Sequence, residues 1–182
     1  MERFPVHTLL PASDAFKSAL RDVQTRFGMI PNLAGATATS PVLAQSFVGI
    51  FDKVHGGSFT EPQIQTVLLT DAVANGCAWA VALHTALGLQ AGLDPEDLDA
   101  MRAGRSPKDS KLGALSTLAR TPIEKRGRLD ERDIQRFLAT GFEKDLLLEA
   151  ITIVAASTIT NYTGNVTNPP LEAHLQQFAW NG

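Results

Sequence analysis

Cysteine is almost absent from this 182-residue sequence, which contains one, Cys77. A single thiol excludes an internal disulfide and any metal cluster built from cysteines alone. It fits a reducing compartment, so we expect a cytoplasmic protein. The first residues, MERFPVHTLLPASD, lack the long apolar segment of a signal peptide, which agrees with that expectation.

Charge of either sign is also scarce. Charged residues make up 19% of the chain, and the formal net charge is -3. The densest basic run, EKRGR at 124–128, is short and falls in an expected loop, so we expect no nucleic-acid partner. The longest apolar-rich run, 146–159, contains Glu149 and several Thr and Ser residues. It is too short and too polar to span a membrane, and we expect no membrane partner.

Motifs for the commonest cofactors are missing. The sequence has no Gly-rich phosphate loop, no HExxH and no GxSxG. We therefore predict no cofactor and no metal. Hydrophobic residues make up 44% of the chain, which indicates a globular protein. The length predicts a single domain over residues 1–182 with a sizeable core.

Start and stop signals for helices occur along nearly the whole chain. Thr60 is the expected N-cap of one helix, with Pro62 in its first turn, and Asp94 is the expected N-cap of another. The run ITIVAASTIT at 151–160 is rich in β-branched residues, but the length of its segment favours a helix. We predict an all-α helical bundle with helices near 13–27, 41–54, 60–75, 77–90, 94–101, within 104–120, 130–141 and 142–162, and one last turn in the tail.

The helix expected at 60–75 is apolar around most of its circumference. Its polar arc contains Gln63, Thr66 and Thr70, whereas Gln65 and Asp71 lie on the apolar side. The segment 143–162 is equally apolar. Two such helices offer more apolar surface than one small domain buries, so we expect a homo-oligomer.

The stretch NGCAWAVALHTALG at 75–88 holds the most reactive side chains. In a helix, Cys77 and His84 lie about 20° apart in azimuth and about 10 Å apart along the axis, which argues against a direct hydrogen bond. Ala80, between them, brings no chemistry. A cysteine that opens a helix has a lowered thiol pKa, which makes Cys77 a candidate reactive thiol. The alternative is that Cys77, His84 and Trp79 are core residues.

The segment NGCAWAVALHTALGLQAGLDPEDLDAMR at 75–102 resembles the signature of the AhpD-like, carboxymuconolactone decarboxylase-like proteins. The flanking segments, 28–47 and 127–172, are also similar to this family, the second to its peroxidase-related members. The resemblance implies an all-helical AhpD-like fold that is usually oligomeric. It also implies a site made of a Glu, a Cys-x-x-Cys pair and a His.

Only part of that site is present in this chain. Cys77 falls on the first Cys and Ala80 on the second, while His84 matches the His and Gln65 stands at the Glu position. Without a second thiol the dithiol cycle cannot run. Gln65 cannot exchange a proton, although its amide can form hydrogen bonds.

Two residues elsewhere could compensate for the missing groups. The decarboxylase branch of the family has a carboxylate at the position of Ala80, and Asp71 could replace it; the alternative is that Asp71 is a hydrogen-bonded buried acid. His55, next to GGS, is a further candidate, and its alternative role is that of an exposed loop histidine.

Three hypotheses follow for the function. The first is a one-Cys thiol peroxidase that acts on hydroperoxides through Cys77 and needs an external thiol reductant. The second is a lyase or isomerase for a small organic acid, with His84 as general acid or base and Gln65 as a donor to an oxyanion. The third is a binding protein without catalysis. Under all three we expect a dimer, trimer or hexamer.

Overall fold

A computed structural model describes residues 4–8, 17, 20, 21, 23–25 and 28–182, and within these residues it contains helices and no strand. The elements are α2 (Asn32–Thr37), α3 (Pro41–His55), α4 (Glu61–Ala74), α5 (Ala78–Gln90), α6 (Pro95–Arg102), α7 (Ser110–Glu124), α8 (Glu131–Leu138), α9 (Lys144–Thr167) and the 3-10 helix η1 (Ala173–Phe178). The predicted all-α class is confirmed. The helix expected at 13–27 lies largely outside the described residues, although residues 17, 20, 21 and 23–25 are helical.

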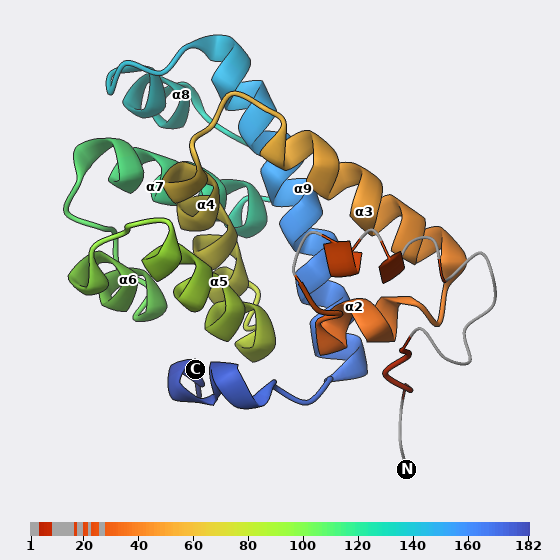
Figure 1. The fold of residues 1–182 in the computed structure, drawn as a ribbon. Coiled ribbons are helices and arrows are strands. Elements are labelled where there is room, and N and C mark those ends of the chain that lie inside the picture. Colours follow the sequence, from red (N-terminus) through yellow and green to blue (C-terminus); the bar gives the residue numbers. More distant parts are fainter. Residues whose placement is uncertain (1–3, 9–16, 18–19, 22, 26–27) are drawn as a thin grey trace.

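Helices α4 and α9 form the centre of the bundle. Helix α9 runs through the molecule between α3 and α4, and α2 packs on its C-terminal half (Figure 1). Helix α4 also packs against α5 and α7, while α6 and η1 lie on α5. Helices α2 to α5 therefore all contact α9.

The helices begin where the sequence signals place them. The backbone N–H of Thr60 donates to Oε1 of Gln63 at 2.9 Å, which fixes the start of α4. The carboxylate of Asp94 accepts a hydrogen bond from the backbone N–H of Glu96 at 2.7 Å at the start of α6. Both predicted N-caps are confirmed.

The turn between α4 and α5 is built on the Asn75–Gly76 pair. Gly76 has a φ of +63°, a conformation that favours glycine. Cys77 follows as the N-cap of α5, and its N–H donates to the carbonyl of Ala72 at 2.9 Å. This short connection folds α5 back along α4, so that side chains of the two helices face each other.

Two helices are longer than predicted. Helix α7 continues to Glu124 and includes Pro122, whereas the sequence predicted a helix within 104–120. Helix α9 continues to Thr167, and its threonine hydroxyls donate to carbonyls one turn earlier, as Thr160 does to Ala156 at 3.1 Å. Contacts with other helices, which sequence signals do not report, stabilise both extensions.

Helix α9 is also long and apolar enough to cross a membrane, judged by length and composition alone. The expectation that this run is too short is therefore wrong for the helix as it forms. Its buried residues, among them Ala150, Ile153 and Ala156, pack against α3 and α4. That packing is the arrangement of a core helix in a helical bundle.

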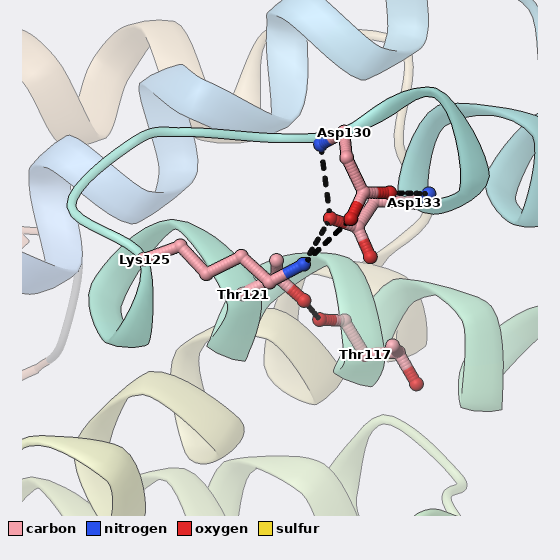
Figure 2. A network of polar contacts seen from close by, with 5 residues as sticks. All are labelled: Thr117, Thr121, Lys125, Asp130 and Asp133. Atoms are coloured by element: carbon pink, nitrogen blue, oxygen red, sulfur yellow. Dashed lines mark hydrogen bonds and ion pairs between the residues drawn. The ribbon is translucent and has the colours of Figure 1, made fainter.

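The link from α7 to α8 is closed by ion pairs, shown in Figure 2. Nζ of Lys125 lies 2.6 Å from Oδ2 of Asp133 and 3.3 Å from Oδ2 of Asp130. Asp130 also accepts the backbone N–H of Asp133 at 3.0 Å, and these contacts lower the pKa of both carboxyls. Part of the basic run at 124–128 is thus paired with acidic residues.

The polar arc of α4 is buried rather than solvated. Thr66 and Thr70 are fully buried, and Oγ1 of Thr70 donates to Oγ of Ser116 on α7 at 3.0 Å. On the side facing α9, Asp71 is fully buried, and neither carboxylate oxygen has a hydrogen bond of normal geometry with a described residue. Burial raises the pKa of Asp71 well above its usual value, and the nearby Ser157 hydroxyl opposes that shift.

Candidate functional site

A cavity of about 190 Å³ lies between α2, α3, α4, α5 and α9. Most of its wall is aliphatic or aromatic, and the polar side chains gather along α3, α4 and α5. Its lining residues are Pro31, Leu33, Ala34, Phe47, Phe51, His55, Glu61, Gln65, Leu68, Trp79, Leu83, His84, Leu87 and Thr160. An apolar cavity with a few polar groups on one wall is the usual form of a small-molecule site.

The polar side chains of this wall form a continuous hydrogen-bonded row. Nδ1 of His84 lies 2.9 Å from Oε1 of Gln65. Nε2 of Gln65 donates to Oε1 of Glu61 at 2.7 Å. The other oxygen of Glu61, Oε2, lies 3.1 Å from Nδ1 of His55. We call these four residues the polar row.

The fold explains how the polar row assembles. Glu61 and Gln65 are four residues apart on α4, so they lie on the same face one turn apart. His55 is the last residue of α3, just before the connection to α4, and His84 lies on α5 opposite Gln65. The row leads from a half-exposed end, at His55 and Glu61, to a buried end at Gln65 and His84.

The buried end of the row is uncharged. Gln65 is 1% exposed and His84 is 3% exposed. Burial lowers the pKa of His84 from 6.5 to about 3, and the electrostatic influence of His55 acts in the same direction. His84 is therefore a neutral imidazole at any ordinary pH.

Cys77 lies apart from the polar row. It lines a different, more polar hollow of about 520 Å³, together with Gly164, Asn165 and Trp180. Trp79 borders both spaces and stands between them. The structure thus brings together two of the three predicted site residues, Gln65 and His84, and leaves Cys77 outside their cavity.

The predicted lowering of the Cys77 pKa is wrong. The thiol is 1% exposed, and burial raises its pKa, although hydrogen bonds from the backbone at Ala80 and Trp79 act in the opposite direction. The favourable position at the start of α5 is outweighed by loss of contact with water. Cys77 therefore has the properties of the alternative considered for it, a small buried core residue.

The wall formed by Trp79 is held by an acid from the C-terminal tail. Nε1 of Trp79 donates to Oε2 of Glu172 at 3.0 Å, and Oε1 of Glu172 accepts the backbone N–H of Asn32 at 2.6 Å. Glu172 is 8% exposed. It ties the tail to the start of α2 and to α5.

Two acidic residues of the site, Glu61 and Glu172, were not predicted. The first carried a signal, because it stands one helical turn before Gln65. The second carried none, because its partners are distant in sequence. Of the two residues considered as substitutes, His55 joins the polar row, whereas Asp71 does not line the cavity. No group of three or more His, Cys, Asp or Glu side chains among the described residues could hold a metal ion.

A protein-family model matches the part of the chain that contains the polar row. Residues 41–110 match the model of the Carboxymuconolactone decarboxylase family. The match covers α3 to α6 and includes the polar row. A comparison with curated protein sequences gave no match.

Solved structures share the fold of this chain. A peroxidase-related protein with an alkylhydroperoxidase AhpD core, from Ralstonia eutropha JMP134, has a TM-score of 0.83 at 19% identity, over 95% of this chain and 93% of that one. A peroxidase-related protein from Silicibacter sp. TM1040 has a TM-score of 0.79 at 18% identity, over 98% and 97% of the two chains. The debrominase Bmp8, as its C82A variant in complex with 2,3,4-tribromopyrrole, has a TM-score of 0.80 at 14% identity, over 98% and 95%. The predicted AhpD-like fold is confirmed.

Proposed function

We propose that this protein binds a small, neutral, mostly apolar molecule in the cavity beside the polar row, and that His84 exchanges a proton with it. The observation that carries the proposal is a neutral imidazole, buried in an apolar cavity and fixed by a hydrogen bond to Gln65. The reaction class is that of the second hypothesis, a lyase or an isomerase. Cys77 has no part in it.

The cavity limits the size and charge of the ligand. An engineered protein cavity of about 150 Å³ binds benzene, so a cavity of about 190 Å³ accommodates a single ring with small substituents. No Lys or Arg is among its lining residues, and the carboxyl of Glu61 is. A carboxylate ligand would therefore lack a counter-charge, which argues against the organic acid of the original hypothesis. The complex of the similarly folded Bmp8 variant with 2,3,4-tribromopyrrole supports a compact ring ligand.

The proposed step is a proton shift. Nε2 of His84 takes a proton from an acidic group of the substrate, and the electron pair of the broken bond stays on the substrate. Nδ1–H continues to donate to Gln65, which spreads the new positive charge toward Glu61. Return of the same proton to another substrate atom completes an isomerisation. The substrate anion forms next to the imidazolium. Attraction between the two charges is strong in an apolar cavity, and it offsets the cost of charging His84 there.

The isomerisation of cyclohex-3-enone to cyclohex-2-enone tests this function. The probe is neutral, contains one ring and requires a single proton shift, and the conjugated product is detected by its ultraviolet absorbance. We expect catalysis by the wild type and a loss of at least about 100-fold in His84→Asn, which keeps a donor to Gln65 but lacks Nε2. Cys77→Ala is the control and should keep the activity. Equal rates in wild type and His84→Asn would contradict the proposal, and binding without turnover would leave the non-catalytic hypothesis.

A one-Cys thiol peroxidase is the second candidate, supported by the fold and by the position of Cys77 at a polar hollow. In that reaction the Cys77 thiolate attacks the hydroperoxide and the O–O bond breaks. The products are a sulfenic acid and an alkoxide, and the proton that the thiol released converts the alkoxide to an alcohol. An external thiol then reduces the sulfenic acid. Burial of the thiol weighs against it. Intact-mass detection of a trapped sulfenic acid after near-stoichiometric peroxide, with Cys77→Ser as control, decides between the two candidates.

We also propose a homo-oligomer that forms through the outer face of α9. Side chains of Leu148, Ile151, Tyr162 and Val166 are each at least half exposed there, and their spacing places them on one stripe. No charged residue occurs between Ile151 and Thr167, so a second copy of the chain can face the stripe without repulsion. The scarcity of cysteine continues to favour a cytoplasmic location.

A further inference from the structure

The hydrogen bonds of the polar row determine which nitrogen of His84 carries its proton. An ionised carboxylate can only accept hydrogen bonds, so the Gln65 group that faces Glu61 must be its amide N–H. The carbonyl oxygen of Gln65 then faces His84. A carbonyl oxygen also only accepts, so Nδ1 of His84 must be the protonated nitrogen. If the side-chain amide of Gln65 were turned by about 180°, its carbonyl oxygen would face the carboxylate oxygen of Glu61, and neither atom could donate a hydrogen bond.

The opposite nitrogen of His84, Nε2, is consequently an acceptor. It forms no hydrogen bond with any described residue, and it is not among the fully buried polar atoms that lack a partner. His84 lines the cavity, so Nε2 keeps access to that space. A ligand atom placed there meets a lone pair and no N–H.

We propose that Glu61, acting through Gln65, holds His84 in the Nδ1–H tautomer, and that the cavity thereby selects neutral ring compounds that present an acidic N–H, O–H or C–H to Nε2. This inference rests on the proposed function for the existence of a ligand, and it adds the class of ligand and a positioning residue. Glu61 acts on the ring through Gln65, which holds the imidazole. His55 donates from Nδ1 to the second oxygen of Glu61 and orients the carboxylate.

The selection follows from the balance of hydrogen bonds. A ligand with a hydrogen-bond donor exchanges its hydrogen bond to water for one to Nε2 of His84. An acceptor-only ligand of the same shape leaves both Nε2 and its own lone pair without a hydrogen bond in an apolar space. A net contribution of one hydrogen bond corresponds to roughly threefold to tenfold in affinity. Pyrrole and furan are a matched pair for this comparison, since both are five-membered aromatic rings and differ in N–H against O.

The first part of the experiment measures the tautomer without any ligand. Long-range ¹⁵N–¹H spectra of the ¹⁵N-labelled protein distinguish a protonated from an unprotonated ring nitrogen, and His84→Asn assigns the signals. We expect Nδ1–H in the wild type and a mixture of tautomers in Glu61→Ala, where Gln65 is free to turn. Glu61→Gln retains an acceptor for Gln65 and should restore Nδ1–H. An Nε2–H tautomer in the wild type, or no change in Glu61→Ala, overturns the inference.

The second part titrates the same samples with pyrrole and with furan and follows the His84 signals. We expect the wild type to bind pyrrole roughly threefold to tenfold more tightly than furan, and the ratio to fall toward one in Glu61→Ala. Furan bound as tightly as pyrrole overturns the selection of donors. If neither ring binds while the wild type shows Nδ1–H, the tautomer assignment stands and the proposed function fails together with the ligand class.

Discussion

His84 and Asp71 are buried ionisable side chains whose pKa values burial moves in opposite directions. Charging either group in the core is unfavourable, so the pKa of the base falls and that of the acid rises. The unfolded chain has ordinary pKa values for both. Each residue therefore makes the stability of the fold depend on pH. His84 lowers the stability as the solution becomes acidic, and Asp71 lowers it at neutral and alkaline pH.

Replacing His84 should flatten the acid side of the stability profile. The folded-state pKa of about 3 lies below the unfolded value of about 6.5, so the unfolded chain takes up the proton first and stability is lost as pH falls from 6.5 toward 3. Between pH 7 and pH 5 we expect the wild type to lose on the order of 2 kcal/mol more than His84→Asn. Urea unfolding at both values measures the difference. An equal loss in both proteins would mean that His84 is protonated in the fold.

Asp71→Asn should stabilise the protein at neutral pH. Because its pKa is raised, Asp71 holds its proton more tightly in the folded chain than in the unfolded chain. The stability gained from this difference is fully present below about pH 3.9 and is lost as pH rises through the folded-state pKa. Asparagine resembles the protonated acid and carries no charge. We expect a higher Tm than the wild type at pH 8 and a smaller difference at pH 4, with roughly 2–4 °C for each kcal/mol. A lower Tm at pH 8 would show that Asp71 has a polar partner when ionised.

At the scale of helices, the close approach of α9 to the start of α5 decides the environment of Cys77. A Cβ added to Gly164 would lie 2.7 Å from the sulfur of Cys77 and 3.1 Å from Cδ1 of Leu33. Both distances are shorter than ordinary contacts. The glycine thus lets the two helices meet, and their contact keeps the thiol out of water.

Gly164→Ala should therefore destabilise the protein by about 1–3 kcal/mol, because a methyl group is forced into filled space. Cys77→Ala in the same chain removes the sulfur and should recover part of the loss, which a double-mutant cycle of chemical denaturation measures. Gly49→Ala on α3 is the matched control. Its new Cβ meets nothing within 4 Å, and we expect a gain of up to about 1 kcal/mol from helix propensity. Additive effects of the two substitutions would contradict the contact.

Helix starts were predictable from the sequence, whereas helix ends and long-range partners were not. The N-caps Thr60 and Asp94 and the break at Asn75–Gly76 are local signals, and the structure has all of them. The C-terminal extension of α9 depends on packing with other helices. In the site, the pairing of Gln65 with His84 followed from family resemblance, and Glu61 could have been found by helical spacing. Glu172 could not, because it meets Trp79 only after the tail folds back.

At the scale of the whole molecule, the stripe on α9 is an exposed apolar surface. It continues into an apolar groove of about 300 Å³ that Tyr162, Val166 and Leu43 line with residues of α2. The stripe and the groove lie side by side on the same face, which is the arrangement that a two-fold symmetric contact needs. The groove of one copy can then receive the stripe of the other.

If the chain self-associates through this stripe, as we propose, Tyr162→Glu combined with Val166→Glu should give a monomer, because the two carboxylates would be buried in the contact without partners. Size-exclusion chromatography with light scattering should then give the chain mass of 19.5 kDa. Ala103→Glu, at an exposed position after α6, is the control and should leave the oligomer intact. A wild type that is already monomeric at high concentration would refute self-association through this stripe.

The position of Trp79 gives the protein an optical probe of its own cavity. Its indole forms part of the cavity wall, and its N–H is tied to the carboxylate of Glu172. A ring that enters the cavity changes the polarity around the indole and can quench its emission. The chain has one other tryptophan, Trp180, so Trp180→Phe leaves a protein whose tryptophan fluorescence comes from the cavity wall alone. Candidate ligands can thus be sorted in a cuvette, with no label, before the reaction itself is known.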